Sequence, residues 1–282
     1  MIKIDNLSFA FKKNEPLFKN LNMDLHPGRT YGLFGLNGAG KTTLLNHICG
    51  ILFPEKGSCL IEDDEARNRH PQTMSQIYLV PEQFELPGIS PSQFTGLHAP
   101  FYPRFDIRQL KEIMKQFHLH EEKKLSEQSY GQRKKFLIAF AIATNTQYLI
   151  MDEPTNGLDI PSKSQFRKIM ASTNRDERCT IISTHQVRDL ETMIDRVTVL
   201  HNGSIIFDQN IEDIANHLVF RKIADDESAE KIYGEEVLGG EYIISPRTSD
   251  DQASMINLEL LFNGVVQSTE QINNAFKTGV TS

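Results

Sequence analysis

The sequence predicts an α/β fold in which helices cover both faces of a mostly parallel β-sheet. Short segments that are apolar throughout, at 30–34, 148–151 and 179–183, alternate with stretches of helical periodicity. Strands that are apolar on both sides are typical of a parallel sheet buried between helices. In addition, the first of these segments runs into a glycine-rich loop and then a helical pattern, which is a strand–loop–helix unit.

The N-terminal region is typical of β structure. Apolar and polar residues alternate over 2–11, and a second strand is predicted at 21–25, where a Pro27-Gly28 turn ends it. We therefore expect an N-terminal antiparallel β subdomain beside the parallel sheet.

A helical insertion is predicted at about 88–146, because the apolar period changes from that of strands to that of helices. Residues 136–143 are apolar all round, which indicates a buried helix. A second, amphipathic helix is marked by Ile107, Leu110, Ile113, Met114 and Phe117.

The remaining strands of the sheet are predicted on both sides of this insertion. One short strand precedes it at 76–80. After it, a strand at 197–200 is joined to 204–207 by an Asn202-Gly203 turn, which favours a hairpin.

Composition and charge exclude several classes of protein. The chain has 282 residues, of which 39% are hydrophobic and 24% charged, as in an ordinary globular protein. Its net charge of −7 is divided unevenly, with −1 on residues 1–216 and −6 on residues 217–282. Because neither part has a basic surplus, we expect no nucleic-acid partner.

The opening residues and the cysteines indicate a chain without membrane spans or disulfides. Residues 1–16 contain no apolar stretch of the kind found in secretory leaders, and no run approaches the ~20 apolar residues of a membrane helix. Cys49, Cys59 and Cys179 are far apart and odd in number. We expect reduced thiols that line the core, in a reducing compartment.

A phosphate-binding motif follows the strand at 30–34. Residues 35–43 match the pattern G-x-x-x-x-G-K-[ST], whose glycines allow backbone amides to surround phosphate oxygens. Lys41 is expected to neutralise the β- and γ-phosphates, and the Thr42 hydroxyl to bind Mg²⁺. The motif predicts a P-loop NTPase core of the RecA-like kind. The candidate nucleotide-binding residues in it are Gly35, Asn37, Gly38, Ala39, Gly40, Lys41, Thr42 and Thr43.

Two acidic residues end the apolar segment at 148–151. A buried strand would deliver Asp152 and Glu153 to the carboxyl edge of the sheet, where open α/β sheets bind ligands. Asp152 is predicted to bind Mg²⁺, and Glu153 to orient or deprotonate an attacking water.

The segment 128–132, Gln-Ser-Tyr-Gly-Gln, resembles the signature motif of the ATP-binding-cassette (ABC) ATPases, usually Leu-Ser-Gly-Gly-Gln. Ser129, Gly131 and Gln132 agree with the motif, whereas Gln128 and Tyr130 depart from it. The resemblance implies that the three shared residues face the γ-phosphate bound to a second subunit. The two departures leave the local packing open.

Other ABC features follow in order. Asp159, in an Asn-Gly-Leu-Asp segment, resembles the residue of the D-loop that lies across the dimer seam. His185 ends a strand as the switch histidine of the family does, and is implied to contact the γ-phosphate and position water. Phe11 matches the aromatic residue that stacks on adenine, with Phe9 as a rival.

The Q-loop has two candidates. Placing the family's glutamine directly after Pro81 selects Glu82, whereas side-chain chemistry selects Gln83. We predict Gln83, as a catalytic residue and a ligand of Mg²⁺.

The resemblance covers residues 1–216, the expected ATP-binding domain, and implies an ATPase that uses ATP and Mg²⁺. One chain has one P-loop and one signature, so a head-to-tail dimer with an identical or related cassette is implied. The implied function is to power a membrane transporter through permease subunits, from the cytoplasmic face of the membrane. A soluble ABC ATPase of translation or DNA repair is the alternative. The translation members resemble two fused cassettes and the repair members carry long coiled-coil insertions, and this sequence shows neither feature.

Residues 217–282 form a predicted accessory extension. They weakly resemble the extension of single-cassette ATPases in exporter-like systems, which implies export. The pieces that carry this resemblance are residues 235–240, a strand at 242–245 and residues 257–266, and a polar loop is expected at 246–254. A short amphipathic helix is marked by Leu258, Leu261, Phe262 and Val265. Packing onto the cassette and a dimer or regulatory contact are both open as its role, and the transported substrate is not encoded here.

Overall fold

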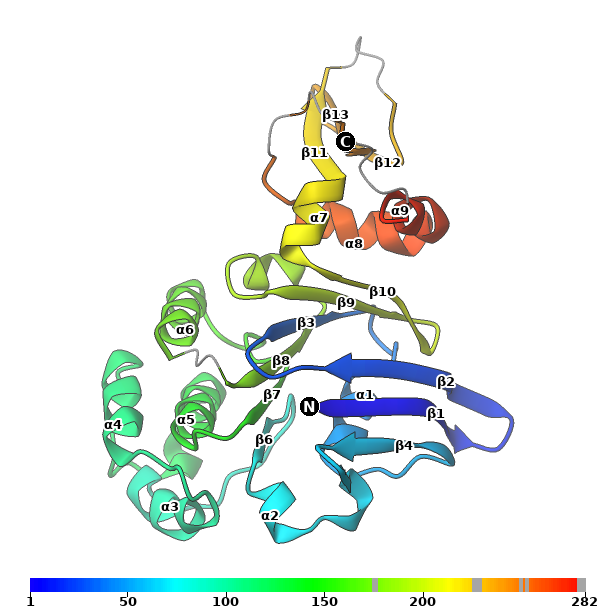
Figure 1. Ribbon diagram of the computed structural model, residues 1–282. Helices are drawn as coiled ribbons and strands as arrows, with labels where there is room; N and C mark the ends of the chain where they lie inside the picture. Colours follow the sequence, from blue (N-terminus) through cyan, green and yellow to red (C-terminus); the bar gives the residue numbers. More distant parts are fainter. Residues whose placement is uncertain (174–176, 225–229, 249–250, 252–253, 278–282) are drawn as a thin grey trace.

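A computed structural model of the protein describes residues 1–173, 177–224, 230–248, 251 and 254–277. Within these residues, the chain forms three β-sheets with helices around them (Figure 1). In the same residues, no helix has both the length and the apolar character that crossing a membrane requires.

The central sheet contains the strands that the apolar segments predicted. Its order is β10-β9-β3-β8-β7-β6, and the pairs are parallel except for β9 with β10. The strands are β3 (Thr30–Phe34), β6 (Ile77–Val80), β7 (Tyr148–Asp152), β8 (Cys179–Thr184), β9 (Arg196–His201) and β10 (Ser204–Asn210). Asn202 and Gly203 both have positive φ, which confirms the predicted hairpin turn.

Both faces of this sheet are buried, as the uninterrupted apolar segments predicted. In β7, Tyr148 and Ile150 belong to one apolar cluster, while Leu149 and Met151 belong to the other. The three cysteines are buried, and burial raises the pKa of the Cys59 and Cys179 thiols to about 12.

The N-terminal sheet is antiparallel, as expected, but larger than predicted. Its order is β2-β1-β4-β5, with β1 (Ile2–Lys12), β2 (Glu15–Leu25), β4 (Lys56–Ile61) and β5 (Asp64–Glu65). The second strand begins at Glu15 instead of residue 21, because buried Phe18 pairs with Phe9 of β1. The polar start of β4 hid that strand from the periodicity analysis.

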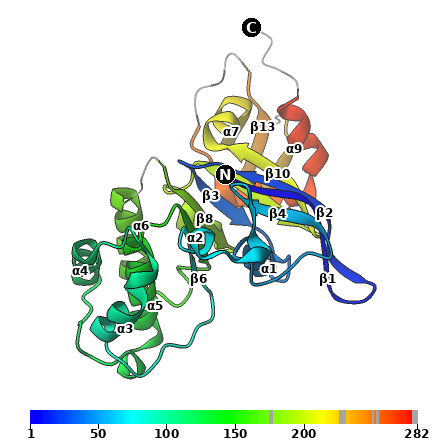
Figure 2. The same ribbon diagram turned by 60° about the horizontal axis from the view of Figure 1, so that its bottom comes forward.

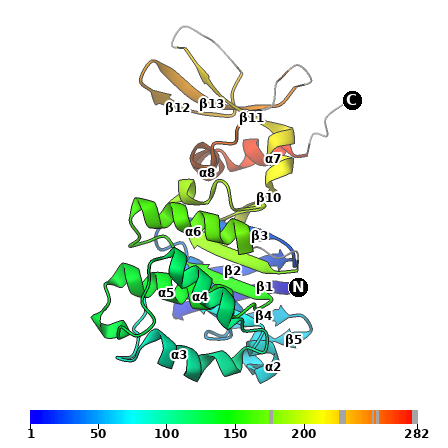
Figure 3. The same ribbon diagram turned by 90° about the vertical axis from the view of Figure 1, so that its left-hand side faces the viewer.

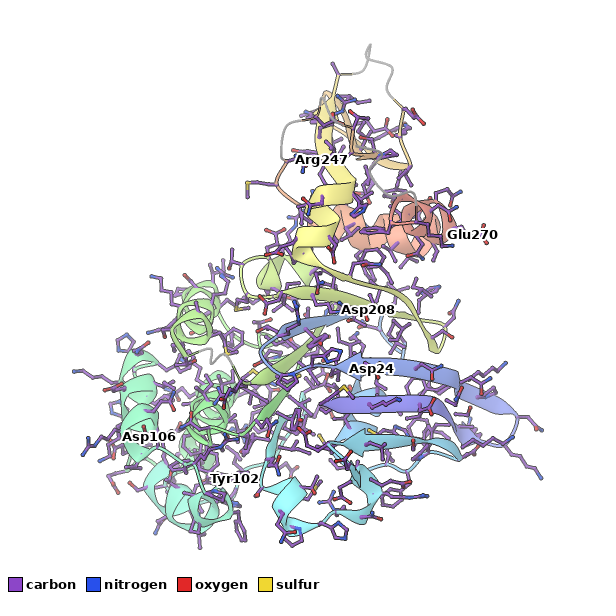
Figure 4. All side chains as sticks on the ribbon, in the orientation of Figure 1. Asp24, Tyr102, Asp106, Asp208, Arg247 and Glu270 are labelled. Atoms are coloured by element: carbon purple, nitrogen blue, oxygen red, sulfur yellow. The ribbon has the colours of Figure 1, made fainter. Side chains whose placement is uncertain are left out.

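Helices surround the central sheet, and α3 to α6 gather on one side of it (Figures 1 and 2). Residues 136–143 of α5 are all buried, as predicted. Asp106, labelled in Figure 4, precedes α4 and caps its first turn. It accepts from the amides of Arg108 and Gln109. Ile107, expected on the buried face, is 47% exposed at the start of this helix. The α-helices up to this point are α1 (Lys41–Ile48), α2 (Pro71–Met74), α3 (Pro91–His98), α4 (Ile107–Gln116), α5 (Tyr130–Ala143) and α6 (Ile160–Thr173).

The C-terminal residues form a third sheet and a pair of helices. After α7 (Ile211–His217), the sheet has the order β11-β13-β12, with β11 (Leu218–Ile223), β12 (Tyr233–Val237) and β13 (Gly240–Pro246). The helices α8 (Leu258–Gln267) and α9 (Thr269–Ala275) follow. Figure 3 shows α8 between this sheet and the central one, and α8 contacts β9, β10, β12 and β13. Its four predicted apolar positions are buried. Parts of the expected loop, 249–250 and 252–253, lie outside the described residues.

Candidate functional site

The loop between β3 and α1 forms the floor of the site. Gly38 and Gly40 have φ of +80° and +101°, a region that glycine adopts readily. A Cβ on Gly40 would lie 2.8 Å from the ring of Phe18, so a side chain is excluded there. Gly40 is also the N-cap of α1, and the positive end of this helix dipole favours an anion.

Lys41 folds back over this loop. Its Nζ donates to the carbonyl oxygens of Gly35 at 2.8 Å and Leu36 at 3.3 Å, and lies 3.8 Å from Glu153 Oε1. Burial lowers the pKa of Lys41, although nearby Glu153 and Asp152 act in the opposite direction. The ammonium is therefore held beside the loop, where a phosphate would supply a stronger partner.

Thr42 and Asp152 place two oxygen ligands next to each other. The Thr42 hydroxyl donates to Asp152 Oδ2 at 2.6 Å, and Ser183 donates to Asp152 Oδ1. Parallel pairing sets Asp152 of β7 opposite Ser183 of β8. A hydroxyl and a carboxylate of this kind suit a hard divalent cation such as Mg²⁺.

Glu153 and His185 meet at the carboxyl ends of β7 and β8. His185 Nδ1 lies 2.8 Å from Glu153 Oε1, and the His185 amide donates to the same oxygen at 3.0 Å. The Thr184 hydroxyl donates to Oε2 at 3.0 Å. Glu153 is buried and has φ of +46°, a strained conformation of a kind that clusters at functional sites.

A cavity of about 380 Å³ lies over these groups. It is lined by the P-loop and by residues from five other segments of the chain. Its lining consists of Phe11, Leu17, Asn37, Gly38, Ala39, Gly40, Lys41, Thr42, Thr43, Glu82, Asp152, Glu153 and His185. Leu17 and Glu82 are the lining residues outside our predicted set, and Leu17 gave no signal because it is an ordinary residue of an N-terminal strand.

The two aromatic candidates for stacking occupy different environments. Phe11 is 67% exposed and lines the cavity, whereas Phe9 is 9% exposed and packs edge-on against His47 in the core. The rings of Phe9 and Phe11 touch edge to face, with centroids 4.9 Å apart. The arrangement therefore leaves Phe11 free for a ligand.

The two Q-loop candidates also separate. Glu82 lines the cavity, and its Oε1 accepts from Asn156 Nδ2 at 3.2 Å. Gln83 is exposed and is not among the residues that line the cavity. The geometry thus favours Glu82 over the predicted Gln83.

The signature residues lie away from this cavity. Ser129 is the N-cap of α5: its Oγ accepts from the Gln132 amide at 3.3 Å, and Gln132 Oε1 accepts from the Ser129 amide at 3.0 Å. Gly131 approaches the carbonyl of Gly157 in the D-loop, because a Cβ there would lie 3.2 Å from that oxygen. Within the described residues, the hydroxyl proton of Ser129 and the amides of Tyr130 and Gly131, which open α5, stay available for an anion.

Asp159 is exposed and accepts from the Ser162 amide at 2.9 Å, at the start of α6. Its hydrogen bonds with Ser162 lower the pKa of its carboxyl. In the isolated chain, this residue therefore stabilises the first turn of α6.

Comparison with known proteins decides the family. A family model described as ABC transporter matches residues 18–156. The energy-coupling factor transporter ATP-binding protein EcfA1 of Ligilactobacillus salivarius is 31% identical, over 76% of this chain and 79% of the relative. The chain belongs to the ABC transporter ATP-binding family. The SkfA peptide export ATP-binding protein SkfE of Bacillus subtilis is 29% identical to this cassette, over 79% of the cassette and 94% of the relative.

Solved structures agree with the fold. The dimeric structure of MJ0796, a bacterial ABC transporter cassette, matches with a TM-score of 0.66 at 23% identity, over 75% of this chain and 99% of that one. The predicted P-loop fold is confirmed, and the cassette is an ATP-binding ATPase of the ABC transporter type.

Proposed function

We propose that this cassette binds ATP with Mg²⁺ and hydrolyses it in a head-to-tail pair of subunits that powers a membrane transporter. The observation that carries the proposal is the composition of the cavity. Among the described residues, those lining it come from the P-loop, the ends of β7 and β8, Phe11, Leu17 and Glu82, and none comes from 128–132. A second subunit would supply that missing signature.

Each side chain of the site has a role that fits its position. Lys41 and the amides of 35–43 hold phosphate oxygens. Thr42 and Asp152 have the oxygens to hold Mg²⁺, which when bound neutralises phosphate charge. Glu153 orients a water molecule and accepts a proton from it. His185 is hydrogen-bonded to Glu153 and holds its carboxylate in place.

Head-to-tail pairing accounts for the surface residues of the site. Ser129, Gly131 and Gln132 face outward to the partner's γ-phosphate, and Asp159 lies at the seam. A two-fold axis then forms two composite sites from one pair of surfaces. The dimeric cassette MJ0796 supports this arrangement at the level of the fold. The partner is a second copy or a related cassette.

Transport requires membrane-spanning permease subunits, which we propose are separate chains. We place the cassette on the cytoplasmic face of the membrane, where such subunits would dock. We also propose the division into an ATP-binding domain at 1–216, with its helical subdomain at about 88–146, and an accessory extension at 217–282. Export is our proposed direction, supported by the relative SkfE, whose name specifies peptide export.

The dimer is tested with Glu153→Gln, which keeps the shape of the side chain and removes its basicity. We expect ATP to convert this variant to a dimer on size-exclusion chromatography, with little hydrolysis. A monomer with undiminished hydrolysis would overturn the proposal.

The direction of transport is tested in two steps. Affinity purification from membranes first identifies the co-purified membrane subunit, and the complex is then reconstituted into vesicles. Reconstituted vesicles with the cassette outside should accumulate substrate for an exporter. Loss of pre-loaded substrate from such vesicles on adding ATP would show import instead.

A further inference from the structure

Tyr130 occupies the place of a signature glycine and fills the junction of three loops. Its ring stacks on Phe84, with centroids 5.2 Å apart and planes inclined by 25°. Its hydroxyl donates to the carbonyl oxygen of Glu82 at 2.7 Å. On the D-loop side, a Cβ on Gly157 would lie 2.8 Å from the ring. Tyr130 therefore joins the signature segment to both the Q-loop and the D-loop.

Lys134 makes a second connection one turn further along α5. Its side chain is 0% exposed, and its Nζ donates to the carbonyl oxygens of Pro81 at 3.0 Å and Glu82 at 3.3 Å. The ammonium also lies 5.5 Å from the centroid of the Phe84 ring. Residues four apart share one face of a helix, so Tyr130 and Lys134 hold the same segment, 81–84.

The segment held in this way reaches the nucleotide cavity. Glu82 lines the cavity, and its carboxylate accepts from Asn156 beside the D-loop. Two residues of α5, Tyr130 and Lys134, hold the carbonyl oxygen of Glu82. Asn156, in the loop after β7, holds its carboxylate. A buried ammonium that keeps carbonyl partners is costly to unpair, which makes this connection hard to break.

We propose that Tyr130 and Lys134 are positioning residues that fasten α5 to the Q-loop of the same subunit. Glu82 at one nucleotide and the signature offered to the partner's nucleotide would then move as one body. The connection itself needs only this chain, whereas its effect on a second site rests on the proposed head-to-tail dimer.

Hydrogen exchange of the nucleotide-free full chain tests the connection without reference to activity. Tyr130→Phe removes one hydroxyl and keeps the ring, and Lys134→Met removes the ammonium and keeps the length. We expect amides in 82–86 to exchange about fivefold faster in each variant. The matched controls are Tyr242→Phe, at a half-exposed tyrosine of β13, and Lys135→Met, the next residue of α5. Neither should change exchange in this segment.

Steady-state kinetics provides the second readout. A positioning role predicts a several-fold lower kcat for Tyr130→Phe, with KM for ATP and the melting temperature kept. Unchanged exchange at 82–86 in both variants would overturn the connection, whatever the rate of ATP hydrolysis. Faster exchange in a protein that neither dimerises nor hydrolyses ATP would support the connection and count against the proposed dimer. If Lys134→Met fails to fold, Tyr130→Phe still decides.

Discussion

Arg188, three residues after His185, forms an ion pair with Glu259 in the first turn of α8. This contact joins the accessory extension to the 3₁₀ turn η4 (Val187–Leu190), which follows the proposed catalytic histidine. Leu190 of η4 and Leu261 of α8 are both fully buried in one apolar cluster, and the two elements are in contact. The extension and the cassette thus share a core at this point.

The shared core predicts unequal effects of two substitutions in α8. Leu261→Ala should lower the free energy of unfolding by about 3 kcal/mol, because it leaves a cavity in a packed cluster. Glu259→Gln should change it by less than about 1 kcal/mol, since both partners of the ion pair are substantially exposed. Urea unfolding measures both. Equal, small effects would show that α8 contributes little to the stability of the cassette.

Phe11 and Phe9 are distinguished by substitution with alanine. Phe11→Ala should raise the Kd for ATP about tenfold, in line with the stacking energy of one base on an aromatic ring, and leave the stability unchanged. Phe9→Ala should lower the stability by about 3 kcal/mol because its ring is buried. Titration with a fluorescent ATP analogue and thermal unfolding separate the two effects. Loss of nucleotide affinity in a folded Phe9→Ala protein, with none in Phe11→Ala, would reverse the assignment.

Glu82 and Gln83 are adjacent, and only Glu82 lines the cavity within the described residues. Glu82→Ala should therefore lower kcat at least tenfold, whereas exposed Gln83→Ala should keep kcat within about twofold. Steady-state ATP hydrolysis at saturating Mg²⁺ measures both. The opposite ranking would restore Gln83 as the Q-loop residue of this cassette.

The strands of the sheet and most of the residues that line the cavity could be predicted from the sequence, because both depend on local signals. The apolar strand that ends in Asp152 and the strand directly before His185 identify the carboxyl edge, and the register of β7 with β8 then places Glu153 beside His185. Leu17 gave no such signal, because its place at the cavity depends on how the N-terminal sheet packs beside α1. The strand β4 was missed because its first residues are polar, and only its long-range pairing with β1 makes it a strand.

Tyr130 shows the limit of motif comparison. Its departure from the signature pattern marked this position as unusual, but did not indicate which residues it contacts. Its contacts with Phe84 and Glu82 depend on the angle at which α5 meets β6 and the loop after it, which no local pattern encodes. The same holds for Lys134, whose place in the basic run 133–135 near the start of α5 was visible but whose carbonyl partners were not.

The burial of Lys134 determines the direction in which the stability of the cassette changes with pH. Burial lowers its pKa from 10.5 to about 8, against the opposing effects of Asp152, Glu82 and Glu153. Between these two values, the unfolded chain binds more protons than the folded one, so stability rises with pH across this window. Below about pH 8 both states are protonated, and the cost of burying the charge, roughly 3 kcal/mol, is fully present. Chemical unfolding at pH 7 and pH 10 measures this change. The free energy of unfolding should rise more between the two pH values in the wild type than in Lys134→Met, in which the titrating group is absent. Exposed Lys111→Met is the matched control and should keep the wild-type dependence on pH. A Lys134→Met protein whose stability follows the wild-type pH profile would show that this ammonium is solvated in the folded chain.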